Sequence, residues 1–202
     1  MKKNMFSIPS VEFFFTMTAV LTSSICVAAP NDLAKKILTE VHHNKVHQAL
    51  ATAQDPYTPI LNLWTQDRTA TLGALLKTIK STSIAPETRW RGIQVSARIS
   101  GSASTGVLKE MLTDKHWMIR DGAIKAAAKI GALPLVGDLE KSLRDPSLIV
   151  RTTAVQALTD LKSIKSAPKI LEALFNPENY VSGKPLWIHR YIQQSIRHLN
   201  FK

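Results

Sequence analysis

The feature that most constrains the fold of this chain is a residue pattern that returns after 31 positions. The pattern Asp114-x5-Arg120-x2-Ala123-Ile124-x-Ala126-Ala127 recurs as Asp145-x5-Arg151-x2-Ala154-Val155-x-Ala157-Leu158. A repeat of this length is typical of helix pairs stacked into a solenoid, because a single pair cannot bury its apolar face alone. Stacks of this kind mostly offer extended binding surfaces.

Weaker copies extend the pattern in both directions. Arg89 precedes Arg120 by 31 residues, and Ile188 follows Val150 by 38, which leaves room for an enlarged loop around 178–184. The alanine-rich second helices should approach their neighbours closely. We expect an all-α, right-handed α-solenoid of about four antiparallel helix pairs over residues 69–202.

Two local signals place helix boundaries and the N-terminal cap. Asp145 followed by Pro146 predicts the N-cap and the first residue of a second helix. Before the repeats, a helix is predicted over 31–53, in which apolar residues recur at helical spacing, namely Leu33, Ile37, Leu38, Val41 and Leu50. We expect residues 29–68 to form capping helices that cover the apolar end of the stack.

These motifs resemble the HEAT-repeat family of armadillo-type helical solenoids, including its bilin-lyase-like short repeats. The resemblance is carried by the alanine-rich second helices together with Asp114, Ile119, Arg120, Asp145, Val150 and Arg151. In that family the aspartate and the arginine form a ladder of ion pairs between neighbouring repeats. The resemblance implies this structural role for Asp114, Arg120, Asp145 and Arg151. The outer copies depart from the pattern, since Ser83, Gly183 and His189 replace the expected partners.

The N-terminus has the order of a secretory signal peptide. Lys2 and Lys3 are followed by an apolar run over 13–25 and by small residues at 26–29. The run is shorter than the roughly 20 residues that a membrane-spanning helix needs. We expect residues 1–28 to be removed and the protein to be exported, to a bacterial periplasm or the exterior. A retained N-terminal anchor is the alternative.

The composition of the mature chain excludes several classes of site. Cys26 is the only cysteine, so removal of the signal excludes disulfides, zinc–thiolate sites and cysteine nucleophiles. Without Lys2, Lys3 and Glu12 the chain keeps 24 of its 26 basic and 14 of its 15 acidic residues, a net charge near +10. Such a surface suits an acidic partner protein, a polyanion or an anionic membrane patch.

The second helices should line the concave face of the solenoid, with their solvent-facing side chains available to a partner. The expected contact residues are Trp90, Arg91, Gln94, Arg98, Lys125, Lys129, Gln156, Arg190, Tyr191, Gln193 and Arg197. The competing interpretation is an ordinary solvated face in a protein that is basic throughout. Trp117 and Trp187, at the starts of second helices, are expected to pack across repeat junctions.

No pattern in the chain predicts catalysis, so we expect no catalytic residues, no metal and no cofactor. His43 and His47 lie four apart on a predicted helix, but a stable zinc site needs three or four protein ligands. The segment from Gly101 to Gly106 lacks the Gly-Lys-Ser/Thr ending of a phosphate-binding loop. The leading interpretation is an adaptor or scaffold that binds an acidic protein. A nucleic-acid binder and a bilin-lyase-like or glycosylase-like enzyme are the alternatives.

Overall fold

The computed structural model describes residues 30–200, so the expected signal peptide over 1–28 lies outside the described residues. The chain divides into two units, residues 1–37 and 38–202. In the first unit, residues 30–37 are helical. The second unit holds the stacked helices described below. Every helix in the described part of the chain is too short or too polar to span a lipid bilayer.

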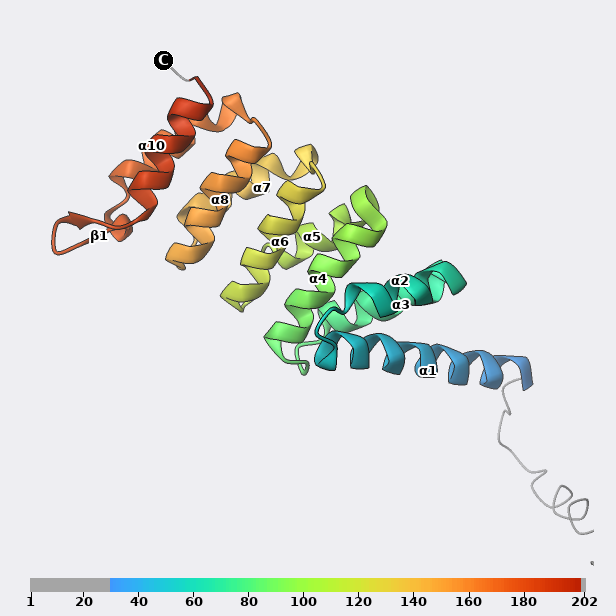
Figure 1. The fold of residues 1–202 in the computed structure, drawn as a ribbon. Helices are drawn as coiled ribbons and strands as arrows, with labels where there is room; N and C mark the ends of the chain where they lie inside the picture. The colour runs from blue at the N-terminus through green and yellow to red at the C-terminus, as the bar shows by residue number, and fades with distance from the viewer. Residues whose placement is uncertain (1–29, 201–202) are drawn as a thin grey trace, which may run out of the picture. The chain divides into compact units, whose positions relative to one another are not determined.

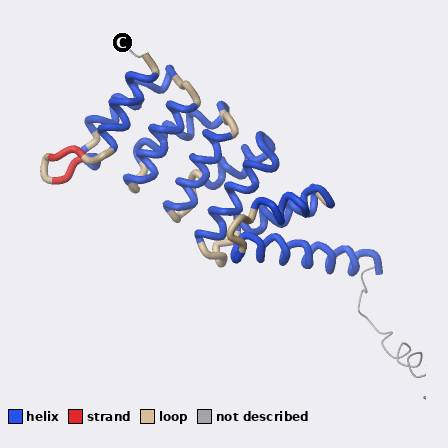
Figure 2. The backbone as a smooth tube through the Cα atoms, in the orientation of Figure 1, coloured by secondary structure: helices blue, strands red, loops and turns tan. Residues whose placement is uncertain are grey.

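The described chain is almost entirely helical (Figure 2). It begins with α1 (Pro30–Thr52) and α2 (Tyr57–Gln66). Within residues 38–200 four helix pairs follow: α3 (Arg68–Lys80) with α4 (Pro86–Ser100), α5 (Thr105–Met111) with α6 (Trp117–Lys129), α7 (Val136–Lys141) with α8 (Leu148–Asp160), and α9 (Ala167–Glu172) with α10 (Ile188–His198). The second helices α4, α6, α8 and α10 lie side by side in that order (Figure 1). The expected all-α stack of helix pairs is confirmed.

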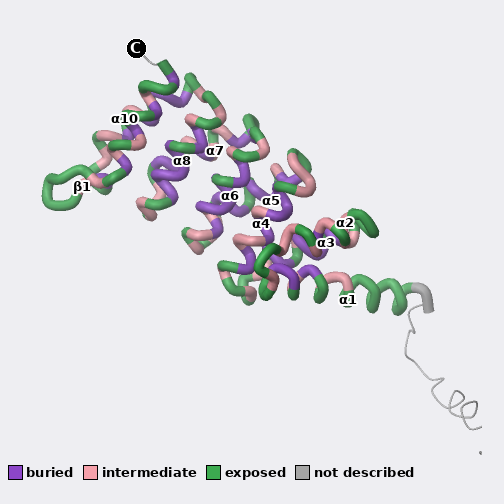
Figure 3. Tube along the Cα trace, viewed as in Figure 1, coloured by how far each residue is buried: buried purple, intermediate pink, exposed green. Residues whose placement is uncertain are grey.

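Small side chains allow the second helices to pack closely. Ala123, Ala126 and Ala127 of α6 are buried, as are Ala154 and Ala157 of α8. Figure 3 shows both helices buried along much of their length. Helix α6 packs directly against α4 on one side and α8 on the other. Because an alanine side chain ends at Cβ, it keeps neighbouring helices near the lower end of the usual axis separation of about 8–10 Å.

A smaller apolar cluster holds the end of α1. Val46 and Leu50 pack there with Leu75 of α3. Leu38 and Val41, which we expected to bury together with Leu50, are instead exposed. Val41 and Leu50 are nine residues apart, which places them on opposite sides of an α-helix, and only the last turns of α1, from Val46 onward, contribute to this cluster.

A β-hairpin, which the sequence did not predict, fills the longer loop before the last second helix. Strand β1 (Tyr180–Val181) pairs antiparallel with β2 (Lys184–Pro185). The two loop residues, Ser182 and Gly183, have φ angles of 50° and 75°. Positive φ at both positions is what a type I′ turn requires, and this turn matches the twist of the flanking strands.

The acidic turn residues differ locally from what we expected. Asp145 and Pro146 do not begin the second helix, because α8 starts at Leu148 with Ser147 in the N-cap position. Instead, Asp145 Oδ1 accepts the backbone N–H of Ser147 at 2.8 Å. Asp114 does the same with the backbone N–H of His116, also at 2.8 Å. Each carboxylate therefore closes the turn before a second helix, and its remaining lone pairs can accept hydrogen bonds from an arginine of the preceding repeat.

A ladder of buried polar contacts joins successive repeats through these turns. Arg120 donates to Asp145 through Nε at 2.6 Å and through Nη2 at 2.7 Å. Its Nη1 donates to the carbonyl oxygens of Asp114 at 2.8 Å and Lys115 at 3.1 Å. Arg89 makes the corresponding ion pair with Asp114, at 2.5 Å from Nη2 to Oδ2. Each guanidinium thus contacts the carboxylate of the next repeat in the forked geometry that such pairs favour.

The last rung of the ladder uses an amide in place of an aspartate. Arg151 Nη1 donates to the carbonyl oxygen of Asp145 at 2.7 Å, as the repeat predicts. Its Nε, however, donates to Asn179 Oδ1 at 2.8 Å, and its Nη2 to the carbonyl oxygen of Glu178 at 2.9 Å. Asn176, which lies 31 residues after Asp145, closes its own turn through the N–H of Glu178. The acceptor for Arg151 therefore lies three residues further along, at the base of the hairpin.

We expect Arg120→Ala to lower the free energy of unfolding by about 3–5 kcal/mol, because it leaves the buried Asp145 carboxylate without its partner. The side chains of this pair are 11% and 8% exposed. Arg144→Ala is the matched control, since Arg144 pairs with Glu172 while 76% and 61% of the two side chains are exposed. It should cost less than about 1 kcal/mol. Equal losses in urea unfolding of the two variants would contradict a stabilising ladder.

The ladder should also make stability depend on acid pH. Burial of Asp114 opposes ionisation, but hydrogen bonds from Arg89 and from the N–H of His116 outweigh it and hold the Asp114 pKa below its usual value. The stabilisation from ionised Asp114 is fully present above the pKa of about 4 that an aspartate has in the unfolded chain. It is lost as pH falls through the lower pKa of Asp114 in the folded protein. The stability deficit of Asp114→Asn, measured by urea unfolding, should therefore be largest at neutral pH and shrink below about pH 4. A constant deficit would contradict this assignment.

Candidate functional site

The solvent-facing positions of the second helices follow the repeat. One series is Gln94, Lys125, Gln156 and Gln194, and a second series one turn later is Arg98, Lys129, Asp160 and His198. Successive members of each series are 31, 31 and 38 residues apart. Because residues four apart share one side of a helix, both series lie on the same face of α4, α6, α8 and α10. We call this surface the second-helix face.

On α4, two of the expected contact residues bind the N-terminal helices. Arg91 Nη1 donates to the carbonyl oxygens of Leu50 at 3.2 Å and Ala53 at 3.0 Å, at the C-terminal end of α1. The Arg98 guanidinium lies 3.5 Å from the centre of the Tyr57 ring on α2. Both cations therefore have partners within the molecule, one with a helix C-terminus and one with an aromatic face.

Two further expected contact residues of α4 face α6. Gln94 Nε2 donates to the carbonyl oxygen of Gly122 at 2.9 Å. Trp90 is partly buried and packs against the main core. A side chain at position 122 would collide with its indole ring, since a Cβ there would lie 2.5 Å from Trp90 Cδ1. The part of the second-helix face on α4 is thus largely engaged in internal packing.

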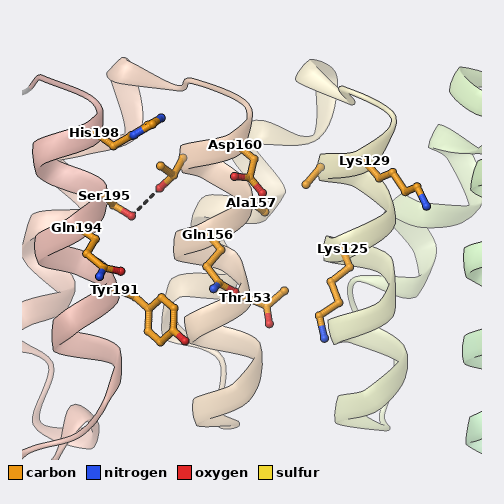
Figure 4. A pocket seen from close by; sticks show the side chains of 12 residues that line it. Lys125, Lys129, Thr153, Gln156, Ala157, Asp160, Tyr191, Gln194, Ser195 and His198 are labelled. Atoms are coloured by element: carbon orange, nitrogen blue, oxygen red, sulfur yellow. Dashed lines mark hydrogen bonds between the residues drawn. The ribbon is translucent and has the colours of Figure 1, made fainter.

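The open part of the second-helix face lies on α6, α8 and α10. A cavity of about 550 Å³ runs across these three helices. Figure 4 shows Lys125 running along α6 and Lys129 extending from α6 away from α8, with Tyr191, Gln194 and His198 on α10 at the other side of the cavity. Its remaining lining residues come mainly from α8 and are Ala128, Thr153, Gln156, Ala157, Thr159, Asp160 and Ser195.

A second cavity of about 550 Å³ joins the first. The two share Thr153, Tyr191 and Gln194. The second cavity adds four residues at the N-terminal ends of α8 and α10, which are Ile149, Thr152, Trp187 and Arg190. We call the two cavities together the α6–α10 groove.

The groove contains some, but not all, of the expected contact residues. Lys125, Lys129, Gln156, Arg190 and Tyr191 line it. On α10 the structure brings Gln194 and His198 into the groove, whereas Gln193 and Arg197 do not line it. Sequence reasoning missed Gln194 and His198, although the 38-residue offset from Gln156 and Asp160 leads directly to them.

The two tryptophans at the starts of second helices are more exposed than we expected of residues that pack across repeat junctions. Trp117 is 37% exposed and Trp187 is 58% exposed. Each stands at the N-terminal end of its helix, Trp117 as the first residue of α6 and Trp187 just before α10. Trp187 is nevertheless held in place, because its Nε1 donates to Thr152 Oγ1 of α8 at 3.1 Å.

The groove carries a positive charge that the protein does not fully neutralise. Lys125 pairs with Asp121 at 2.8 Å, and this buried carboxylate also accepts the hydroxyl of Thr153 at 2.7 Å. Lys129 and Arg190 have no ion-pair partner among residues 30–200. On the first helices, by contrast, cations are paired with acids, as in Arg144–Glu172, Lys141–Asp138 and Lys169–Glu140.

The histidines of α1 take part in helix packing. His42 Nε2 lies 2.8 Å from Thr71 Oγ1 of α3. His43 and His47 stack with their ring centres 6.4 Å apart. Burial, reinforced by the charge of Lys77, lowers the pKa of His43 below its usual value. Within residues 30–200 no three His, Cys, Asp or Glu side chains are placed to hold a metal ion together.

Comparison with protein families agrees with this geometry. The family described as HEAT repeats matches from residue 72, within α3, to residue 159, near the end of α8. Residues 72–159 are HEAT repeats. HEAT repeats commonly mediate protein binding. The pair α9 and α10 lies beyond the matched residues and continues the stack (Figure 1). No curated protein matches the chain.

The contact between Trp90 and Gly122 predicts that α4 and α6 tolerate no larger residue there. Gly122→Ala should lower the free energy of unfolding by about 1–3 kcal/mol, the usual cost of overpacking. Gly137→Ala in α7 is the control, because its added Cβ would meet nothing within 4 Å. That variant should be neutral or more stable by up to about 1 kcal/mol, since alanine favours the helix. The contact would be refuted if chemical unfolding showed Gly122→Ala to be as stable as Gly137→Ala.

Proposed function

We propose that this HEAT-repeat protein is a non-catalytic adaptor or scaffold, and that it binds an acidic partner protein through the α6–α10 groove. The observation that carries the proposal is the joining of two cavities, each of about 550 Å³, on the open part of the second-helix face. Cations line both cavities, and among the lining residues Asp160 alone is acidic. An acidic partner would gain both on-rate and orientation from this charge.

The distribution of internal contacts favours the same part of the molecule. On α4 the side chains at the edge of the core bind α1, α2 and α6, as Arg91, Arg98 and Gln94 show. On α8 and α10 the equivalent positions, Gln156 and Gln194, face the groove. A partner would therefore engage the C-terminal half of the stack.

We further propose that the protein acts outside the cytoplasm, in a bacterial periplasm or beyond. The proposal rests on the basic start, apolar run and small residues of the first 29 positions. The experiment is mass determination of the N-terminus of the protein recovered from its native host. Cleavage between Ala28 and Ala29 is the expected result, and an intact Met1 would contradict it.

The binding proposal predicts a position-specific cross-link. A photoreactive benzoylphenylalanine at Gln156, inside the groove, should capture a protein in native cell extract, whereas the same group at the exposed Ser102 should not capture it. Lys125→Glu together with Lys129→Glu should lower the yield at least fivefold, because the groove then repels an acidic surface. Lys115→Glu together with Lys165→Glu reverses two exposed charges outside the groove and serves as the matched control.

Three results would reject the proposal. The first is equal cross-linking from Gln156 and Ser102, and the second is equal loss with both charge-reversal pairs. The third is an adduct that nuclease removes and whose yield falls steeply with salt. That pattern would assign the groove to a nucleic acid, since binding through phosphates releases counterions.

A further inference from the structure

We infer that the α6–α10 groove takes an extended, acidic segment of the partner, with one aromatic or large aliphatic side chain as its anchor. The inference rests on the proposed function and adds the form and the chemistry of the bound segment. Three features of the groove lead to it: an apolar slot at one end, amide side chains along its middle, and two lysines on α6, of which Lys129 has no ion-pair partner among residues 30–200.

The apolar slot lies between the N-terminal ends of α8 and α10. Ile149 and Trp187 are both exposed, and they line the same cavity together with Tyr191. The indole of Trp187 is fixed across the slot, because its Nε1 donates to Thr152 Oγ1, which in turn donates to the carbonyl oxygen of Leu148 at 2.8 Å. Because this apolar surface is already held in one orientation, a ligand that packs on it loses little side-chain entropy. Anchor sites at interfaces usually have this property.

The middle of the groove suits a polypeptide backbone. Gln156 and Gln194 line it, and among residues 30–200 neither amide has an intramolecular hydrogen-bond partner. Each amide offers both donors and an acceptor. An extended segment presents an unpaired N–H and C=O at every residue, whereas a helix has already paired most of its own. Amides in this position therefore favour an extended segment over a helix.

The position of the lysines on α6, across the groove from the slot, sets how far the acidic residues of a bound segment should lie from its anchor residue. Lys125 and Lys129 of α6 line the groove, Lys125 running along α6 and Lys129 extending away from α8 (Figure 4). Neighbouring helices lie about 8–10 Å apart, and an extended chain advances about 3.3 Å per residue. A segment of about four or five residues therefore leads from the α8–α10 slot to the lysines. Arg190, beside the slot, adds a second cation for an acid next to the anchor.

A designed peptide tests this reading. The probes are dye-labelled, end-capped Phe-Ser-Ser-Ser-Glu-Glu and its reversed sequence, with binding measured by fluorescence anisotropy on the full chain. For whichever of the two sequences binds more tightly, replacing Phe by Ala, or both Glu by Gln, should weaken binding at least fivefold.

Variants of the protein test which residues are responsible. Trp187→Ala should abolish the difference in affinity between the Phe and Ala peptides while keeping that between the Glu and Gln peptides. Lys129→Gln should reduce the preference for Glu while keeping that for Phe. Phe175→Ala, at an aromatic side chain that is 77% exposed outside the groove, should change neither.

The inference fails if neither direction binds more tightly than about 1 mM. It also fails if Phe and Ala peptides bind equally, or if a single-stranded oligonucleotide displaces the acidic peptide more effectively than the unlabelled peptide does. Circular dichroism of each variant establishes that the fold survives. If the peptides do not bind but Gln156 still cross-links a protein, this inference is overturned and the proposed function stands. If the cross-link is absent too, both are overturned.

Discussion

One arginine on each of α4, α6 and α8 ties its repeat to the next, and the rest of the stack depends on that contact. The Arg120 guanidinium bonds to the carbonyl oxygens of its own turn and to both carboxylate oxygens of Asp145. The carboxylate in turn closes the next helix start through the N–H of Ser147. One buried pair therefore fixes both a turn and the spacing between repeats. Buried alanines on α6 and α8 are compatible with that spacing, because a longer side chain would force the helices apart.

The same constraint explains which part of the second-helix face stays open. Where a repeat has N-terminal neighbours, its solvent-facing side chains bind them, as Arg91 does with the end of α1. Further along, the side chains at equivalent positions line a groove. The ladder also joins the start of α8 to the turn before the hairpin, through Arg151 and Asn179. Residues of the groove add to this packing, since Thr153 of α8 binds Asp121 of α6 and Trp187 binds Thr152 of α8.

Much of the fold could be predicted from the sequence because its main contacts repeat. The resemblance carried by Asp114 and Asp145 implied the ladder, and the alanine spacing predicted the second helices. Asn179 could not be found in this way, because the hairpin at 180–185 displaces the acceptor from the position that the 31-residue spacing indicates. The exposure of Trp187 could not be predicted from the sequence either, because tryptophan side chains are on average mostly buried. Gln194 could have been predicted from the sequence, because it follows Gln156 by the same 38 residues that separate Ile188 from Val150.

The most direct test of the account is native-state hydrogen exchange of the backbone amides of α6 and α8, followed with and without Arg120→Ala. If the ladder couples the repeats, the most protected amides of both helices should exchange with one common opening free energy in the natural sequence. In the variant, α8 should open at a lower free energy than α6. Separate opening of α6 and α8 in the natural sequence, or an unchanged common value in the variant, would contradict the claim that this arginine holds the stack together.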